Sequence, residues 1–156
     1  MKKIIRILFL VLVVGIIVIQ FFQPEKNLGK MTTDHMFLQT KVPESVQLTL
    51  KKACLDCHSN QTHYQWYHKF APVSWFISNH IQEGKHELNL SEWRPISTMD
   101  KIGKLEDMKK EVQEGKMPLK SYTLIHADAR LSEVEKQSLI QWIESYQEDL
   151  VLEATE

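Results

Sequence analysis

Both cysteines of this chain lie within one short stretch, CLDCHSN, at residues 54–60. Cys54 and Cys57 are three positions apart, and His58 follows the second cysteine directly. On an α-helix, positions three and four apart share one side, so the two thiols and the imidazole can face a single partner. This pattern constrains the fold more than any other feature, because the remaining residues have to enclose whatever these three side chains hold.

The C-x-x-C-H spacing is the attachment signature of c-type haem. In this chemistry each thiol forms a thioether with a vinyl group of the porphyrin, and the adjacent imidazole binds the iron. We therefore predict one covalently bound haem c, attached through Cys54 and Cys57, with His58 as an axial ligand of the iron.

Other chemistries would use part of this pattern. A thioredoxin-like dithiol needs a βαβ context and no histidine. A disulfide between Cys54 and Cys57 would close a very small loop and stabilise the fold little. A zinc ion would need a fourth ligand, for which His63 and His80 are candidates. A structural zinc or thiol module therefore stays open beside haem.

The second axial position of the iron has competing candidates. Met117, in EGKMPLKSY, precedes Pro118, which favours an extended backbone at Met117 and a loop that brings the thioether inward. His80 is the alternative distal ligand, because it falls on the apolar face of a predicted helix, where a hydrogen-bonded core role is also open to it. His126 is a third candidate. We predict Met117, with His80 as the alternative.

Four aromatic residues cluster in the sequence around the segment that contains His80. Such side chains could shield a porphyrin from water, and they could equally belong to the ordinary core of a small domain. The candidates for the haem pocket are Trp66, Tyr67, Trp75 and Trp93.

The first 22 residues read as a membrane anchor. Lys2, Lys3 and Arg6 precede an apolar run that ends at Phe22, and with Ile4 and Ile5 the run is about 28 Å long as a helix. Basic residues before such a run keep the N-terminus in the cytoplasm. We therefore predict an uncleaved transmembrane helix in the inner membrane of a bacterium, crossing once, with the C-terminal domain in the periplasm.

The rest of the chain is expected to be all-α. Residues 1–22 form the anchor, 23–42 a tether and 43–156 the haem-binding domain. Apolar residues recur at helical spacing in segments 43–58, 71–89, 98–115 and 131–150, and Ser132 with Glu135 forms a capping box. No stretch alternates long enough to predict a strand. The predicted inward residues include Val46, Leu50, Ala53, Val73, Phe76, Ile77, Ile81, Met99, Ile102, Leu105, Met108, Val112, Leu139, Trp142, Ile143, Tyr146 and Leu150.

Two stretches carry a resemblance to a known family. They are ACLDCHSNQTHYQWYHKFAPVSWFISNHIQEGKHELNLSEW and EGKMPLKSYTLIHADARLSEVEKQSLIQWI. The chain from about Pro43 to Tyr146 resembles the bacterial haem-binding domain family, small C-x-x-C-H proteins often tethered to the membrane. The resemblance implies a cytochrome c-like helical domain with Cys54, Cys57 and His58 in the roles given above. It does not choose between His80 and Met117.

These observations predict a membrane-anchored monohaem c-type cytochrome that transfers single electrons to redox partner proteins. It is expected to be an electron carrier rather than an enzyme. A net charge of −1 gives no indication of nucleic-acid binding. The alternative is a haem-based gas or redox sensor, or a small haem enzyme, in which the distal ligand dissociates.

Overall fold

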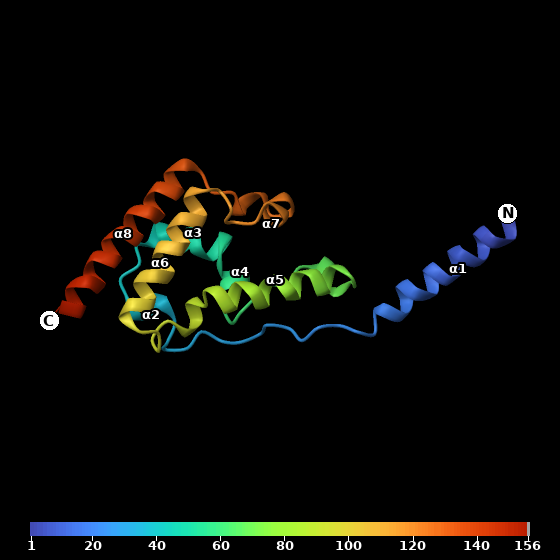
Figure 1. Ribbon diagram of the computed structural model, residues 1–156, viewed down its shortest axis with the longest axis horizontal. Helices are drawn as coiled ribbons and strands as arrows, with labels where there is room; N and C mark the ends of the chain where they lie inside the picture. The colour runs from blue at the N-terminus through green and yellow to red at the C-terminus, as the bar shows by residue number, and fades with distance from the viewer. Residues whose placement is uncertain (156) are drawn as a thin grey trace.

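The computed structural model describes residues 1–155, and this part of the chain contains helices and no β-strand (Figure 1). The prediction of an all-helical chain is therefore confirmed. In chain order the longer helices are α1 (Lys2–Ile19), α3 (Glu44–Ala53), α5 (Val73–Glu87), α6 (Thr98–Gln113) and α8 (Glu133–Thr155). Shorter helices lie between them: α2 (Met36–Gln39), α4 (Leu55–His58), η1 (Trp66–Lys69), η2 (Leu90–Glu92), α7 (Lys120–Ile125) and η3 (Ala127–Ala129).

Helices α3, α6 and α8 pack together and enclose the main core (Figure 1). Trp93, Leu139 and Ile143 are completely buried in it. The indole Nε1 of Trp93 donates a 2.9 Å hydrogen bond to the hydroxyl of Tyr146, so the largest buried side chain leaves no polar atom unsatisfied. The core thus closes without any contribution from α1 or α7.

Local signals in the sequence account for the ends of the two longest core helices. The Ser97 hydroxyl accepts a 3.2 Å hydrogen bond from the Asp100 amide and caps α6. Gly115 follows that helix with a φ of 66°, a conformation that favours glycine. Ser132 and Glu135 form the predicted capping box at the start of α8, with bonds of 2.8 and 3.3 Å.

The predicted apolar faces are only partly buried. On α8 all five predicted residues are buried, as are Leu105, Met108 and Val112 on α6. Met99 is 72% exposed, however, so the stripe of α6 begins later than predicted. On α5 the prediction was wrong for Val73 and Phe76, which are exposed because they border a cavity that α5 and α7 leave unfilled.

The N-terminal helix does not meet the length that we predicted for a membrane anchor. Among residues 1–155, no helix is both long enough and apolar enough to cross a bilayer. Helix α1 ends at Ile19 and contains Lys2, Lys3 and Arg6, so its apolar part, residues 7–19, is roughly 20 Å long against about 30 Å of hydrocarbon. The predictions of a transmembrane helix and of single-pass location in the inner membrane are therefore wrong.

The segment predicted as a tether lies against the helical domain over much of its length. Asn27 donates 2.8 and 2.9 Å side-chain hydrogen bonds to the Ser59 carbonyl and the Thr62 hydroxyl. Further along, His35 and Met36 are buried, and the Asp34 carbonyl accepts the amide of Trp93 at 2.9 Å. These contacts hold Asn27 beside the segment after α4 and residues 34–36 beside η2.

Candidate functional site

The C-x-x-C-H motif spans a break between two helices. Helix α3 ends at Ala53, and Cys54, with a φ of −126°, separates it from α4. The amides of Cys57 and His58 then both bond to the Cys54 carbonyl, at 3.1 and 2.9 Å. The motif therefore forms its own single turn, which sets the two thiols and the imidazole together at the edge of a hollow.

That hollow has a volume of about 290 Å³ and is bordered by the predicted attachment and iron-binding residues and by the alternative His80, but not by the third candidate, His126. Cys54, Cys57 and His58 border it from the motif, His80 borders it from α5, and Met117 borders it from the loop before α7. A second hollow of about 370 Å³, beside α6, adjoins the first. The two share the walls formed by Ala53, Cys54, His58, Glu87, Met117 and Pro118.

The imidazole of His58 is held in one tautomer. Its Nδ1 lies 3.0 Å from the Leu88 carbonyl, and because a carbonyl only accepts, Nδ1 carries the proton. Burial lowers the pKa of His58 from its ordinary value, against the opposing effect of backbone hydrogen bonds to Leu88 and Gly84. The neutral ring therefore keeps a lone pair on Nε2, which is the state in which histidine binds a metal.

Helix α5 approaches the motif very closely at one glycine. A Cβ atom placed on Gly84 would lie 2.9 Å from the carbonyl oxygen of Cys57. Gly84 lies inside α5, which continues to Glu87. Its role in the structure is to let α5 pack directly on the turn that carries Cys57.

The two cysteines are free thiols in a setting that keeps them protonated. Burial, with the neighbouring Cys57 as a smaller cause, raises the pKa of Cys54 to about 12. Burial, with the charge of Asp56, raises the pKa of Cys57 to about 11. A redox-active dithiol needs a thiolate of lowered pKa, so these surroundings do not suit one. Residues 1–155 also contain no group of three or more His, Cys, Asp and Glu side chains arranged to hold a metal ion.

Met117 and His80 both border the hollow, Met117 from the loop before α7 and His80 from α5. The amide of Met117 donates a 3.1 Å hydrogen bond to the Glu111 carbonyl, which fixes its loop to the end of α6. His80 has its Nδ1 2.8 Å from the Phe76 carbonyl, one turn earlier on α5. Met117 borders both hollows, whereas His80 borders the smaller one and a third cavity beside it.

The four aromatic candidates are not gathered at this site. Trp93 is in the main core, where it bonds to Tyr146. Trp66 is 72% exposed and lies on η1, and Trp75 is partly exposed on α5, where its indole donates to the Phe22 carbonyl. Tyr67 alone borders a cavity next to the motif.

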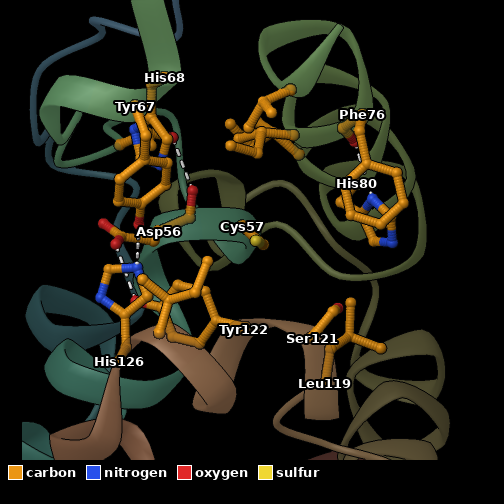
Figure 2. Close-up of a pocket in the computed structure, with 15 residues that line it drawn as sticks. Asp56, Cys57, Tyr67, His68, Phe76, His80, Leu119, Ser121, Tyr122 and His126 are labelled. Carbon is orange, nitrogen blue, oxygen red and sulfur yellow. Dashed lines mark hydrogen bonds between the residues drawn. The ribbon is translucent and has the colours of Figure 1, made fainter. Parts of the chain in front are cut away.

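A hydrogen-bonded cluster that the sequence did not reveal lies beside the motif (Figure 2). Asp56, between the two cysteines, accepts a 2.8 Å hydrogen bond from the Tyr122 hydroxyl and another of 2.8 Å from the His63 amide. Burial, followed by the charge of Asp56, raises the pKa of Tyr122, so its hydroxyl stays a donor. Tyr122 stacks on His126, whose Nε2 lies 2.6 Å from the hydroxyl of Tyr67. The cluster ties the motif to α7 and to η1.

The signals for this cluster were present but could not be interpreted from the sequence alone. Asp56 lies inside C-x-x-C-H, and Tyr122 ends the G-x-M-P-L-x-S-Y stretch that carries Met117. Only the folded structure shows that the Tyr122 hydroxyl donates a hydrogen bond to Asp56. The Leu88 carbonyl, a backbone group, has no signal in the sequence at all.

Comparison with known proteins gives one result. The family model for the haem-binding domain matches residues 14–145, which is most of the chain. No curated protein matches, and no solved structure matches.

Proposed function

This chain belongs to the haem-binding domain family, and we propose that it holds one haem covalently, through Cys54 and Cys57, and transfers single electrons. The observation that carries this proposal is the single hollow bordered by both thiols, the His58 imidazole and the Met117 thioether. With the hollow that adjoins it, the available space falls within the range of about 300–1,000 Å³ typical of cofactor pockets. The side chains that border the hollow therefore fit a covalently bound haem.

The proposed roles follow from the chemistry of each side chain. Cys54 and Cys57 supply the thioether sulfurs, each by addition of its thiol across a vinyl group of the porphyrin. His58 supplies Nε2 as the proximal ligand, oriented by the hydrogen bond from Nδ1 to the Leu88 carbonyl. When bound, haem would supply one-electron chemistry by cycling between ferric and ferrous iron.

Met117 is the proposed distal ligand, with His80 as its competitor. Met117 borders both hollows, and its loop is tied at two points, by the amide bond to Glu111 and by the bond from Tyr122 to Asp56. The hollow beside α6 has Leu88, Leu90 and Leu131 in its wall, together with charged side chains that include Lys104 and Glu111. The proposed partners are redox proteins that exchange electrons with this centre.

The experiment records absorption spectra of the oxidised and reduced protein, purified from cells that have haem-attachment machinery. A low-spin spectrum is expected, and Met117→Ala should convert it to high spin while His80→Ala leaves it unchanged. The reverse result would assign the distal position to His80. If the unmutated ferrous protein is high-spin and binds CO, the chain is a sensor or a small haem enzyme, and electron transfer is the wrong proposal.

A further inference from the structure

A third cavity lies beside Cys57, between α5 and α7 (Figure 2), and it shares Asp56, Cys57, His80, Leu119 and Tyr122 with the 290 Å³ hollow. Its volume is about 110 Å³. Figure 2 shows Phe76 and His80 on one side, Tyr122 and His126 on the other, and Cys57 behind and between them. None of the residues on the 370 Å³ hollow borders this cavity, so it lies on the far side of the motif from α6.

The size and the walls of the cavity suit one six-membered ring. An apolar cavity of about 150 Å³ in another protein binds benzene, and this cavity is slightly smaller and partly open. Its walls are almost entirely apolar, with contributions from Phe76, Ile77, Ile81 and Ile125. No lysine or arginine borders it, which favours a neutral occupant over an anion.

His80 adds one directed polar contact to this apolar cavity. Its Nδ1 lies 2.8 Å from the Phe76 carbonyl, so Nδ1 carries the proton of the neutral ring and Nε2 is left as an acceptor. Of the other polar groups nearby, Tyr122 donates to Asp56 and Tyr67 pairs with His126, while the Ser121 hydroxyl also borders the cavity and can either donate or accept. The Nε2 of the neutral His80 ring can only accept, so it selects a donor.

We propose that this cavity is a binding site for a neutral single-ring phenol, with the ring between Phe76 and Ile125 and the hydroxyl donating to Nε2 of His80. This site gives His80 a role apart from the iron. An imidazole bound to iron through Nε2 could not also accept this hydrogen bond, so the two roles exclude each other. The site adjoins Cys57, which places its occupant next to the edge of the proposed haem.

The test measures binding of phenol and of benzene to the purified haem-loaded protein by isothermal titration calorimetry, in a mildly alkaline buffer that keeps imidazole neutral. Phenol is expected to bind about five- to tenfold more tightly than benzene, which is the contribution of one net hydrogen bond. His80→Phe should reduce phenol to the affinity of benzene. Ile125→Trp should abolish binding of both, because a larger side chain at this exposed wall position fills the cavity.

The matched control is Leu124→Trp, since Leu124 is next to Ile125, is 76% exposed and does not border the cavity. It should leave both affinities unchanged. Equal affinity for phenol and benzene, or phenol binding that survives Ile125→Trp, would overturn the proposal. Binding seen only in haem-free Cys54→Ser/Cys57→Ser protein would also overturn it, because haem itself would then occupy this space. Covalent haem is measured separately by mass, so its absence would contradict the proposed function without deciding this one.

Discussion

The two sides of the helical domain differ in how completely they close. Around α3, α6 and α8, side chains such as Leu139 and Ile143 are fully buried, and the polar atoms of Trp93 and Tyr146 bond to each other. Around α5 and α7, Phe76 and Ile125 are more than half exposed and open hollows border the motif. Exposed apolar surface of this kind is costly unless something covers it. The comparison indicates that the side around α3, α6 and α8, the closed side, is stable by itself. The side around α5 and α7, the open side, depends on what it binds.

The largest effect is expected from a substitution that creates a cavity in the core of the closed side. Ile143→Ala should lower the free energy of unfolding by about 3–4 kcal/mol, because Ile143 is completely buried among well-packed neighbours. Urea denaturation of the haem-loaded and the haem-free protein measures it, and the loss should be the same in both. The control is Leu152→Ala on the same helix, where the side chain is 63% exposed and the change should stay below about 0.5 kcal/mol. A loss that depends on haem would contradict the division into two sides.

The next effect concerns the open side. In Cys54→Ser/Cys57→Ser protein, which cannot attach haem, amide exchange in α4, α5 and α7 should accelerate about a hundredfold, because bound ligand stabilises what it contacts. Helix α8 should change less than about tenfold, since none of its residues borders either hollow. Hydrogen exchange followed by mass spectrometry measures this difference. An equal acceleration in all helices would show that the domain is a single cooperative unit.

A smaller effect is expected where the two sides meet, at Gly84. Gly84→Ala places a Cβ 2.9 Å from the Cys57 carbonyl and should destabilise the protein by about 1–2 kcal/mol, after the gain in helix propensity is subtracted. Gly103→Ala on α6 is the matched control, because no atom lies within 4 Å of its Cβ position. The control should stabilise the protein by up to about 1 kcal/mol. Thermal unfolding measures both, and equal signs for the two substitutions would refute the close approach of α5 to the motif.

The smallest effect is a pH dependence that belongs to the closed side. Hydrogen bonds from Lys52 and from Ser132 lower the pKa of Glu135 to about 2, from an ordinary value of 4.5. A carboxyl with a lowered pKa stabilises the fold above pH 4.5, and this contribution disappears as the pH falls towards 2. The group is partly exposed, so solvent screening limits the effect to about 1 kcal/mol. In Glu135→Gln protein the free energy of unfolding should therefore fall less between pH 4.5 and pH 2 than in the unmutated protein. An equal fall in both proteins would contradict the lowered pKa of Glu135.

The sequence predicted the closed side far better than the open one. Helical spacing and the Ser132 capping box identified α8 and its buried residues, because those signals are local. The same spacing failed on α5, where Val73 and Phe76 are exposed, since a pattern cannot show whether another element covers a face. It also overestimated α1, because hydropathy alone extended the run across Gln20 to Phe22, beyond the end of the helix at Ile19.

The candidate site was predictable where its residues are contiguous. Cys54, Cys57 and His58 formed a recognisable pattern, and the structure places them on one hollow with Met117 and His80. Trp93 was named as a pocket candidate from its neighbourhood in the sequence, yet it lies in the main core. Asp56, Tyr122 and the Leu88 carbonyl came to light only in three dimensions, because their roles depend on contacts between distant segments.

The central claim is that haem is attached covalently to the motif, and the mass of the denatured protein tests it most directly. Protein from cells with haem-attachment machinery should exceed the mass of its polypeptide by one haem, and a proteolytic fragment that contains Cys54, Cys57 and His58 should carry the addition. The addition should be lost in the Cys54→Ser/Cys57→Ser variant. A denatured chain with the mass of the bare polypeptide, although purified with haem present, would contradict covalent attachment.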